Sequence, residues 1–149
     1  MSSLSAIVLW YSIQLLYIWC LVLNVSFYLC PQALEVNILL RKAATASTPV
    51  TEISEAGGEW TVKTSTTLKT MELKFKLGEE FDEKTPDGRD VKAKVTFEDG
   101  KIVTVQKAKS EKEKSTKSVR EMKGADELVY TMTIDGVEGL VCVQKFKRV

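Results

Sequence analysis

Several residue types are rare or missing in this sequence, and each absence narrows the chemistry open to the protein. There is no histidine, which removes the commonest general base and the histidine ligands of zinc sites. No nucleophile–base pair or phosphate-binding loop can be found either, so we expect neither an enzyme nor a bound cofactor or metal. Three scattered cysteines, Cys20, Cys30 and Cys142, predict no disulfide framework and favour a reducing compartment.

Charge is balanced overall but unevenly distributed along the chain. The 21 basic and 20 acidic residues leave a net charge of +1, which gives no support to a nucleic-acid partner. All of these charges lie after Leu34. The sequence therefore divides into an uncharged apolar segment, residues 1–30, and a domain covering residues 31–149.

The uncharged segment allows three interpretations. The run Leu4–Cys30 is long enough for a membrane-spanning helix, which needs about 20 apolar residues. The first cations, Arg41 and Lys42, follow it, and the positive-inside rule would then place the domain in the cytosol. The richness in β-branched and aromatic residues also fits a buried hairpin, and the segment could be an atypical start of the chain.

Beyond this segment, the pattern predicts one helix followed by an all-β meander. Pro31 suits a first helical turn, and Leu34, Ile38 and Lys42 share one face, which indicates a helix over Pro31–Ala44. Alternation and turn signals such as Asp99-Gly100 then predict about eight strands. These are Val50–Ser54, Trp60–Thr66, Met71–Lys76, Val91–Phe97, Lys101–Lys107, Ser115–Met122, Leu128–Ile134 and Gly139–Lys147. Such a meander avoids exposed edges by closing into an up-and-down antiparallel β-barrel.

The stretch Phe75–Lys92 is predicted to be a wide, turn-rich connection between two strands. Gly78 permits positive φ, and Pro86-Asp87-Gly88 favours a tight turn. We expect Arg89 to face the acidic residues that precede this turn, which are Glu79, Glu80, Asp82 and Glu83.

The strand faces predict a mixed interior. One face of the strand Leu128–Ile134 carries Tyr130 and Met132, while one face of Ser115–Met122 carries Arg120. If these faces point inward, the arginine costs several kcal/mol unless it is paired and solvated, and a ligand carboxylate is a natural partner. The pattern fits equally well an exposed Arg120 that forms an ion pair with Glu121 or Glu127.

Several segments resemble one known family. The run LGEEFDEKTPDGRDVK, the helix LLRKAATASTP, the run TEISEAGGEWTVKTSTTLKTMELKFKLGEEFDE and the tail LVCVQKFKRV are similar to the cytosolic fatty acid-binding proteins. These are intracellular lipid-binding proteins of the calycin superfamily, and the likeness covers Leu34–Val149. It implies ten strands in a clam-like barrel around a water-filled cavity, with a lid of two short helices. The ligand carboxylate is expected to meet an arginine–arginine–tyrosine set.

The resemblance also assigns individual positions. Arg120, in SVRE, matches the first arginine, while Gln144 stands at the second arginine position and Phe146 at the tyrosine position. Because relatives that bind retinol use glutamine, Gln144 admits an alcohol, aldehyde or ester head group. Three further positions match an inward polar site, the portal and the cavity rim: Gln106, Leu68 and Asp87.

The start of the chain departs from the family. The expected first strand, with its F-x-G-x-W-type motif, and the first lid helix are not recognisable in Met1–Cys30. Without that strand, the edges of Val50–Ser54 and Gly139–Lys147 would stay unpaired. Either the apolar start supplies a substitute strand, or the barrel is open there.

The resemblance implies a cytoplasmic, monomeric carrier of long-chain fatty acids or related amphipathic lipids. Such a carrier would contact membrane surfaces transiently and bind no nucleic acid. The alternatives are a membrane-anchored β-domain with a structural or docking role, and a carrier of retinoids or neutral lipids.

Overall fold

The computed structural model describes residues 17–25, by their backbone, and residues 38–39, 42, 48–66 and 69–148. Ten antiparallel strands form one sheet within these ranges. Their bounds are β1 Tyr17–Val25, β2 Val50–Ala56, β3 Glu59–Ser65, β4 Thr70–Lys76, β5 Glu80–Lys84, β6 Asp90–Glu98, β7 Lys101–Ala108, β8 Thr116–Lys123, β9 Glu127–Ile134 and β10 Val141–Arg148. The all-β, up-and-down architecture predicted from the sequence is confirmed.

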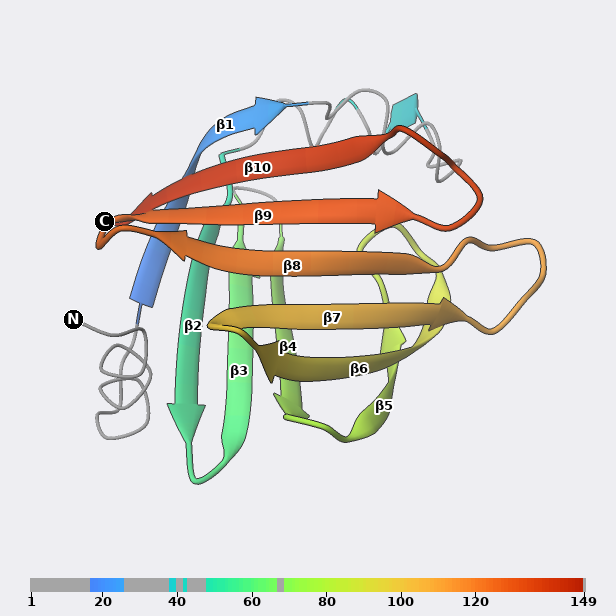
Figure 1. The fold of residues 1–149 in the computed structure, drawn as a ribbon, viewed down its shortest axis with the longest axis horizontal. Helices are drawn as coiled ribbons and strands as arrows, with labels where there is room; N and C mark the ends of the chain where they lie inside the picture. Colours follow the sequence, from blue (N-terminus) through green and yellow to red (C-terminus); the bar gives the residue numbers. More distant parts are fainter. Residues whose placement is uncertain (1–16, 26–37, 40–41, 43–47, 67–68, 149) are drawn as a thin grey trace.

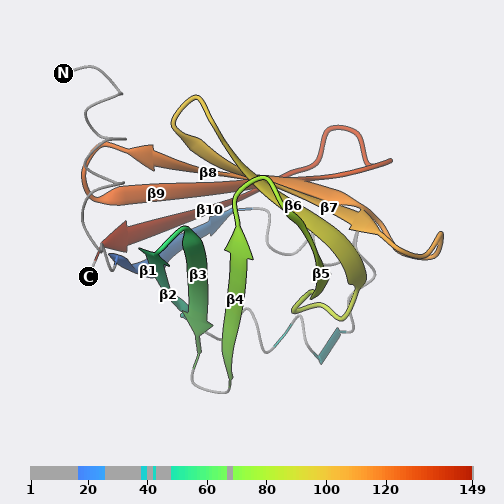
Figure 2. The same ribbon diagram turned by 90° about the horizontal axis from the view of Figure 1, so that it is seen from below.

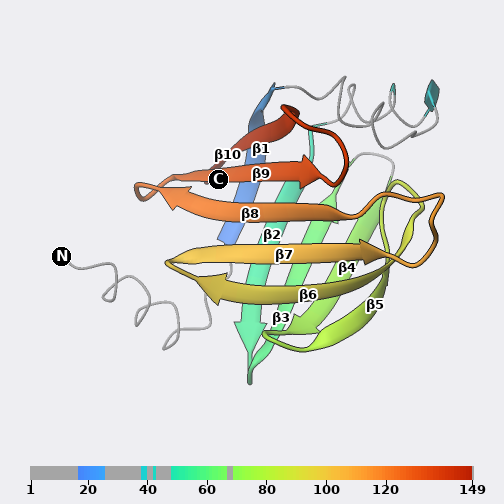
Figure 3. The same ribbon diagram turned by 45° about the vertical axis from the view of Figure 1, so that its right-hand side comes forward.

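Strand β1 joins the two ends of the meander. The sheet order is β4-β3-β2-β1-β10-β9-β8-β7-β6-β5, so β1 and β10 are the one pair of neighbouring strands in this sheet that do not follow each other in the sequence. Cys20 pairs with Val50 of β2, and Trp19 pairs with Arg148 of β10. The uncharged segment therefore supplies the strand that covers both edges. Figures 1 and 3 show the result, in which β6–β10 cross over β2–β4 like the two halves of a clam.

The backbone ladder ends at β4 and β5, and side chains bridge the space between these strands. The two strands diverge from a short link, Leu77–Glu79 (Figure 2). The rings of Phe75 on β4 and Phe81 on β5 stack with centroids 6.0 Å apart. The Gly78 N–H, at a φ of 80° that suits glycine, donates to the Val95 carbonyl at 2.8 Å. Aromatic stacking and this hydrogen bond thus hold β4 and β5 where strand pairing is absent.

The prediction of one wide connection within Phe75–Lys92 is wrong, because Glu80–Lys84 forms β5 and pairs with β6. Acidic residues fill most of this short strand, and their composition concealed its alternation. Arg89 does not form an ion pair with the four acidic residues that it was expected to face, although its charge reaches Glu83. Its Nε donates to Asp87 Oδ2 at 2.6 Å and its Nη1 donates to the Lys114 carbonyl at 2.7 Å.

Arg89 locks the turn between β5 and β6. Its own N–H donates to Thr85 Oγ1 at 3.0 Å, and the Thr85 N–H donates to the Arg89 carbonyl at 2.9 Å. The Arg89 side chain is 8% exposed, which is low for a cation. Since Lys114 belongs to the connection between β7 and β8, the arginine ties two neighbouring connections at one end of the sheet.

The apolar core lies on the inner face of the sheet and draws on both halves of the clam. Side chains along a strand point alternately to the two faces of the sheet, so every second residue lies on the inner face. On β6 these residues are the buried Val91, Ala93 and Val95. The central cluster consists of Ile53, Trp60, Phe75, Val95, Ile102, Leu128 and Phe146. The inner face of the sheet is therefore apolar in its central cluster, and polar side chains of the same face lie beside that cluster.

Three further expectations concern the helix, the cysteines and the membrane. Ile38, Leu39 and Lys42 are helical, as predicted, and the rest of the predicted helix lies outside the described residues. Cys142 is disulfide-bonded, although the three scattered cysteines predicted no disulfide framework; their sequence spacing held no pairing signal. Among the described residues, no helix has the length and apolar character needed to span a bilayer.

We predict that Arg89→Ala lowers the free energy of unfolding by about 3 kcal/mol, because it leaves Asp87 and a carbonyl without their partner. Urea unfolding followed by circular dichroism measures this change. The control is Lys74→Ala, which removes an exposed ion pair to Glu72 (3.3 Å) and should cost about 0.5 kcal/mol or less. Equal midpoints for the two variants would contradict the assigned role of Arg89.

Candidate functional site

A row of side chains crosses the inner face at the centre of the sheet. Register pairs Ile102 with Arg120, Arg120 with Tyr130, and Tyr130 with Gln144. Directly paired residues of antiparallel strands point to the same face. Because Ile102 is a core residue, this face is the inner one. The register therefore brings a cation, a phenol and an amide together inside the clam.

A cavity of about 60 Å³ lies over this row, which is room for a few water molecules. Its apolar wall comes from both halves of the clam: Ile53, Val62, Leu73, Phe75, Val95 and Ile102. Its polar wall comes from β5 and β7–β9: Glu83, Thr104, Gln106, Ser118, Arg120 and Tyr130. A pocket with a large apolar wall and a few convergent polar groups suits an amphipathic ligand.

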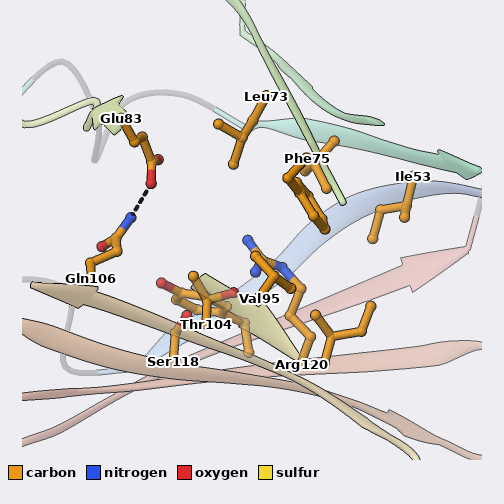
Figure 4. Close-up of a pocket in the computed structure, with 12 residues that line it drawn as sticks. Ile53, Leu73, Phe75, Glu83, Val95, Thr104, Gln106, Ser118 and Arg120 are labelled. Carbon is orange, nitrogen blue, oxygen red and sulfur yellow. Dashed lines mark hydrogen bonds between the residues drawn. The ribbon is translucent and has the colours of Figure 1, made fainter. Parts of the chain in front are cut away.

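Arg120 is the cation of this cavity wall. Figure 4 shows its guanidinium reaching into the space towards the wall that carries Phe75 and Leu73. Its Cζ lies 4.8 Å from the centroid of the Tyr130 ring, a cation–π contact. Within the described part of the chain, the guanidinium makes no hydrogen bond or ion pair. Its donors are therefore directed at the cavity.

Opposite this cation, Glu83 and Gln106 form a short hydrogen-bonded chain. Gln106 Nε2 donates to Glu83 Oε2 at 2.8 Å (Figure 4), and Thr116 Oγ1 donates to Gln106 Oε1 at 2.8 Å. Burial raises the pKa of the Glu83 carboxyl, and the nearby charge of Asp87 adds to the rise. The hydrogen bond from Gln106 and the charges of Arg120 and Arg89 oppose it. The cavity wall thus carries one carboxyl group and one guanidinium, and the charge of the guanidinium partly offsets the rise in the pKa of the Glu83 carboxyl.

Comparison with known proteins agrees with this architecture. The model of the lipocalin / cytosolic fatty-acid binding protein family matches residues 31–149. The chain is 40% identical over 133 residues to human cellular retinoic acid-binding protein 2, covering 87% of this chain and 94% of that protein. The chain belongs to the lipocalin / cytosolic fatty-acid binding protein family.

Solved structures of the family have the same fold. Apo lipid binding protein 8 of Caenorhabditis elegans superposes with a TM-score of 0.83 at 30% identity, covering 89% of this chain and 94% of that one. The fatty acid binding protein of Schistosoma mansoni, solved with arachidonic acid, gives a TM-score of 0.79 at 32% identity, covering 90% and 95%. The clam of ten strands is therefore the arrangement found in these relatives.

Most of the predicted site residues lie in or near the cavity. Arg120, Gln106 and Tyr130 line the described cavity. Gln144 belongs to the row of Arg120 and Tyr130, while Phe146 is buried in the apolar cluster of the same face.

The remaining predicted residues lie elsewhere or outside the described chain. Met132 accepts a hydrogen bond from the Tyr130 hydroxyl at 3.6 Å, so it lies beside the row. Asp87 is paired with Arg89 and is absent from the cavity wall that the structure describes. Leu68, the predicted portal residue, lies outside the described residues. The ligand-binding roles of all these residues stay predictions.

Glu83 was missed by the sequence analysis, which placed it in a solvated acidic loop. The available signal was alternation within Glu80–Lys84. Phe81 and Glu83 occupy the same face of a strand, and Phe81 packs against the core. Around the cavity and elsewhere in the described residues, no group of three Cys, Asp or Glu side chains could hold a metal ion.

We predict that Glu83→Gln raises the free energy of unfolding at neutral pH. A carboxyl whose pKa is higher in the folded than in the unfolded state contributes stability below its unfolded pKa, and this stability is lost as the pH rises through the folded pKa. Burying the charged form is therefore a cost at neutral pH, and glutamine removes it while it can still bond to Gln106.

Urea unfolding at about pH 5 and about pH 8 measures this effect. The advantage of Glu83→Gln over the unchanged protein should be larger at the higher pH. An advantage that shrinks as the pH rises would show that burial does not dominate at this carboxyl.

Proposed function

We propose that this protein is a non-enzymatic, intracellular carrier of long-chain fatty acids or related amphipathic lipids. The observation that carries the proposal is Arg120, whose guanidinium points into a cavity with an apolar and a polar wall and makes no ion pair among the described residues. An inward cation costs free energy unless something neutralises it. The carboxylate of a lipid would do so through a charge-assisted hydrogen bond.

Burial of the lipid tail supplies the binding free energy, and the polar residues of the central row orient the lipid head group. Each methylene moved from water into the clam contributes about 0.8 kcal/mol. Arg120 and Gln144 then hold the head group at the centre of the sheet, with Tyr130 between them in register. The carrier would act as a monomer and release its ligand during transient contacts with membrane surfaces.

The names of relatives support a lipid as the ligand. The similar schistosome structure contains arachidonic acid, and the human relative is named for retinoic acid. Both are apolar molecules with one carboxylate, which is the chemistry that Arg120 suits.

A second candidate is a carrier of retinoids or neutral lipids, and Gln144 favours it. An amide at this row position donates and accepts hydrogen bonds without charge, so it suits an alcohol, aldehyde or ester. Both candidates use the same cavity and differ in the head group.

The proposed role of residues 1–30 as a membrane attachment is a separate question. Tyr17–Val25 forms β1, and a strand paired on both sides is not available to a spanning helix at the same time. Carbonate extraction of the full-length protein from membranes tests attachment directly.

We predict that Arg120→Gln lowers the affinity for a long-chain fatty acid by about tenfold or more, since a hydrogen bond to a charged group is worth about 1.5–3 kcal/mol. Displacement of a fluorescent fatty acid at neutral pH measures the change. The matched control is Lys117→Gln, which makes the same charge change on the exposed face of the same strand. An equal effect of the two variants, or no effect of either, would contradict the proposed role of Arg120.

A further inference from the structure

The cavity contains an acidic group that a simple carboxylate-binding site would not need. Glu83 lies on the cavity wall together with Arg120, and the charge of Arg120 reaches it. Gln144, which stands where the family resemblance expects a second arginine, carries no charge. With Glu83 ionised, the charges on the described cavity wall therefore sum to zero.

The surroundings of Glu83 hold its carboxylate in place. Gln106 on β7 donates to it, and Thr116 on β8 fixes the orientation of Gln106. The charged groups that act on Glu83 are Arg120 from β8, with Arg89 and Asp87 from the turn that follows β5. Arg89 is already paired with Asp87, which leaves Arg120 as the cation in the cavity that Glu83 can offset.

The rest of the polar wall consists of neutral groups. Thr104 and Ser118 present hydroxyls, Gln106 an amide and Tyr130 a phenol. These groups can donate to or accept from an uncharged head group. An anionic head group, in contrast, would bring a second negative charge into a confined space that already contains Glu83, and like charges at short range disfavour each other.

We propose that Glu83 tunes head-group specificity: its carboxylate offsets part of the charge of Arg120, so that the cavity binds anionic head groups less tightly than it would without Glu83 and also accepts uncharged polar ones. This inference rests on the proposed function, because it concerns the head group of the lipid that the cavity carries. Protonation of Glu83 removes the offset, so anionic lipids bind more tightly as the pH falls.

The test uses two ligands with the same tail and full-length protein. Hexadecyl sulfate keeps its negative charge across the pH range, and 1-hexadecanol has none. Displacement of a fluorescent lipid probe gives the affinity for each ligand at neutral pH, and the ratio of the two affinities reports head-group preference independently of tail burial.

The variants are Glu83→Gln and Asp82→Asn. Asp82 is the neighbouring residue on the exposed face of β5, where it pairs with Lys109 at 2.8 Å, so its replacement makes the same charge change outside the cavity. Glu83→Gln should raise the affinity for hexadecyl sulfate about tenfold while hexadecanol binding changes by less than about twofold. Asp82→Asn should leave the ratio as it is.

The unchanged protein provides a second measurement. Its ratio of sulfate to alcohol affinity should rise between about pH 8 and pH 5, and the ratio of Glu83→Gln should stay flat. A ratio that is the same in Glu83→Gln as in the unchanged protein, or that Asp82→Asn raises equally, overturns the inference. Failure of the unchanged protein to bind either ligand would instead overturn the proposed function.

Discussion

The structure depends on the pairing of one strand, β1, with two strands that are far apart in the sequence. Because β1 contacts β2 on one side and β10 on the other, the two halves of the meander become one continuous sheet. A continuous sheet that folds on itself has an inner face, and the row from Ile102 to Gln144 runs across it. The pairing of β1 with β2 and β10 therefore brings the two walls of the cavity into one sheet.

Much of this fold could be predicted from the sequence. Each of the eight expected strands corresponds to an observed strand whose ends lie within two residues. The alternation of apolar residues and the Asp-Gly and Gly-Gly turns carry that information. Two strands were not among these eight, for opposite reasons: a strand in the apolar start was expected only as one alternative, and β5 was not expected at all. Strand β1 lies in an uncharged, mostly apolar run, where no alternation is visible, and β5 lies among acidic residues that resemble a solvated loop.

The candidate site was predictable in part. The family pattern identified Arg120, Gln144, Phe146 and Gln106, and register now shows that Arg120 and Gln144 share a row with Tyr130. Glu83 could not be placed without β5, because its inward direction follows from the strand. The ion pair of Arg89 with Asp87 was also out of reach, since it depends on the geometry of one tight turn.

The chemistry of the cavity follows from two opposite charges, the Arg120 guanidinium and the Glu83 carboxylate, which lie on its wall beside apolar residues. One cation and one acid balance each other when the cavity is free, and an entering head group changes that balance. The most direct test of the central claim is a crystal structure of the protein with hexadecanoate. The account predicts a head-group oxygen within hydrogen-bonding distance of the Arg120 guanidinium, with the tail along the wall formed by Phe75 and Ile53. A ligand whose carboxylate lies at the protein surface, away from Arg120, would contradict it.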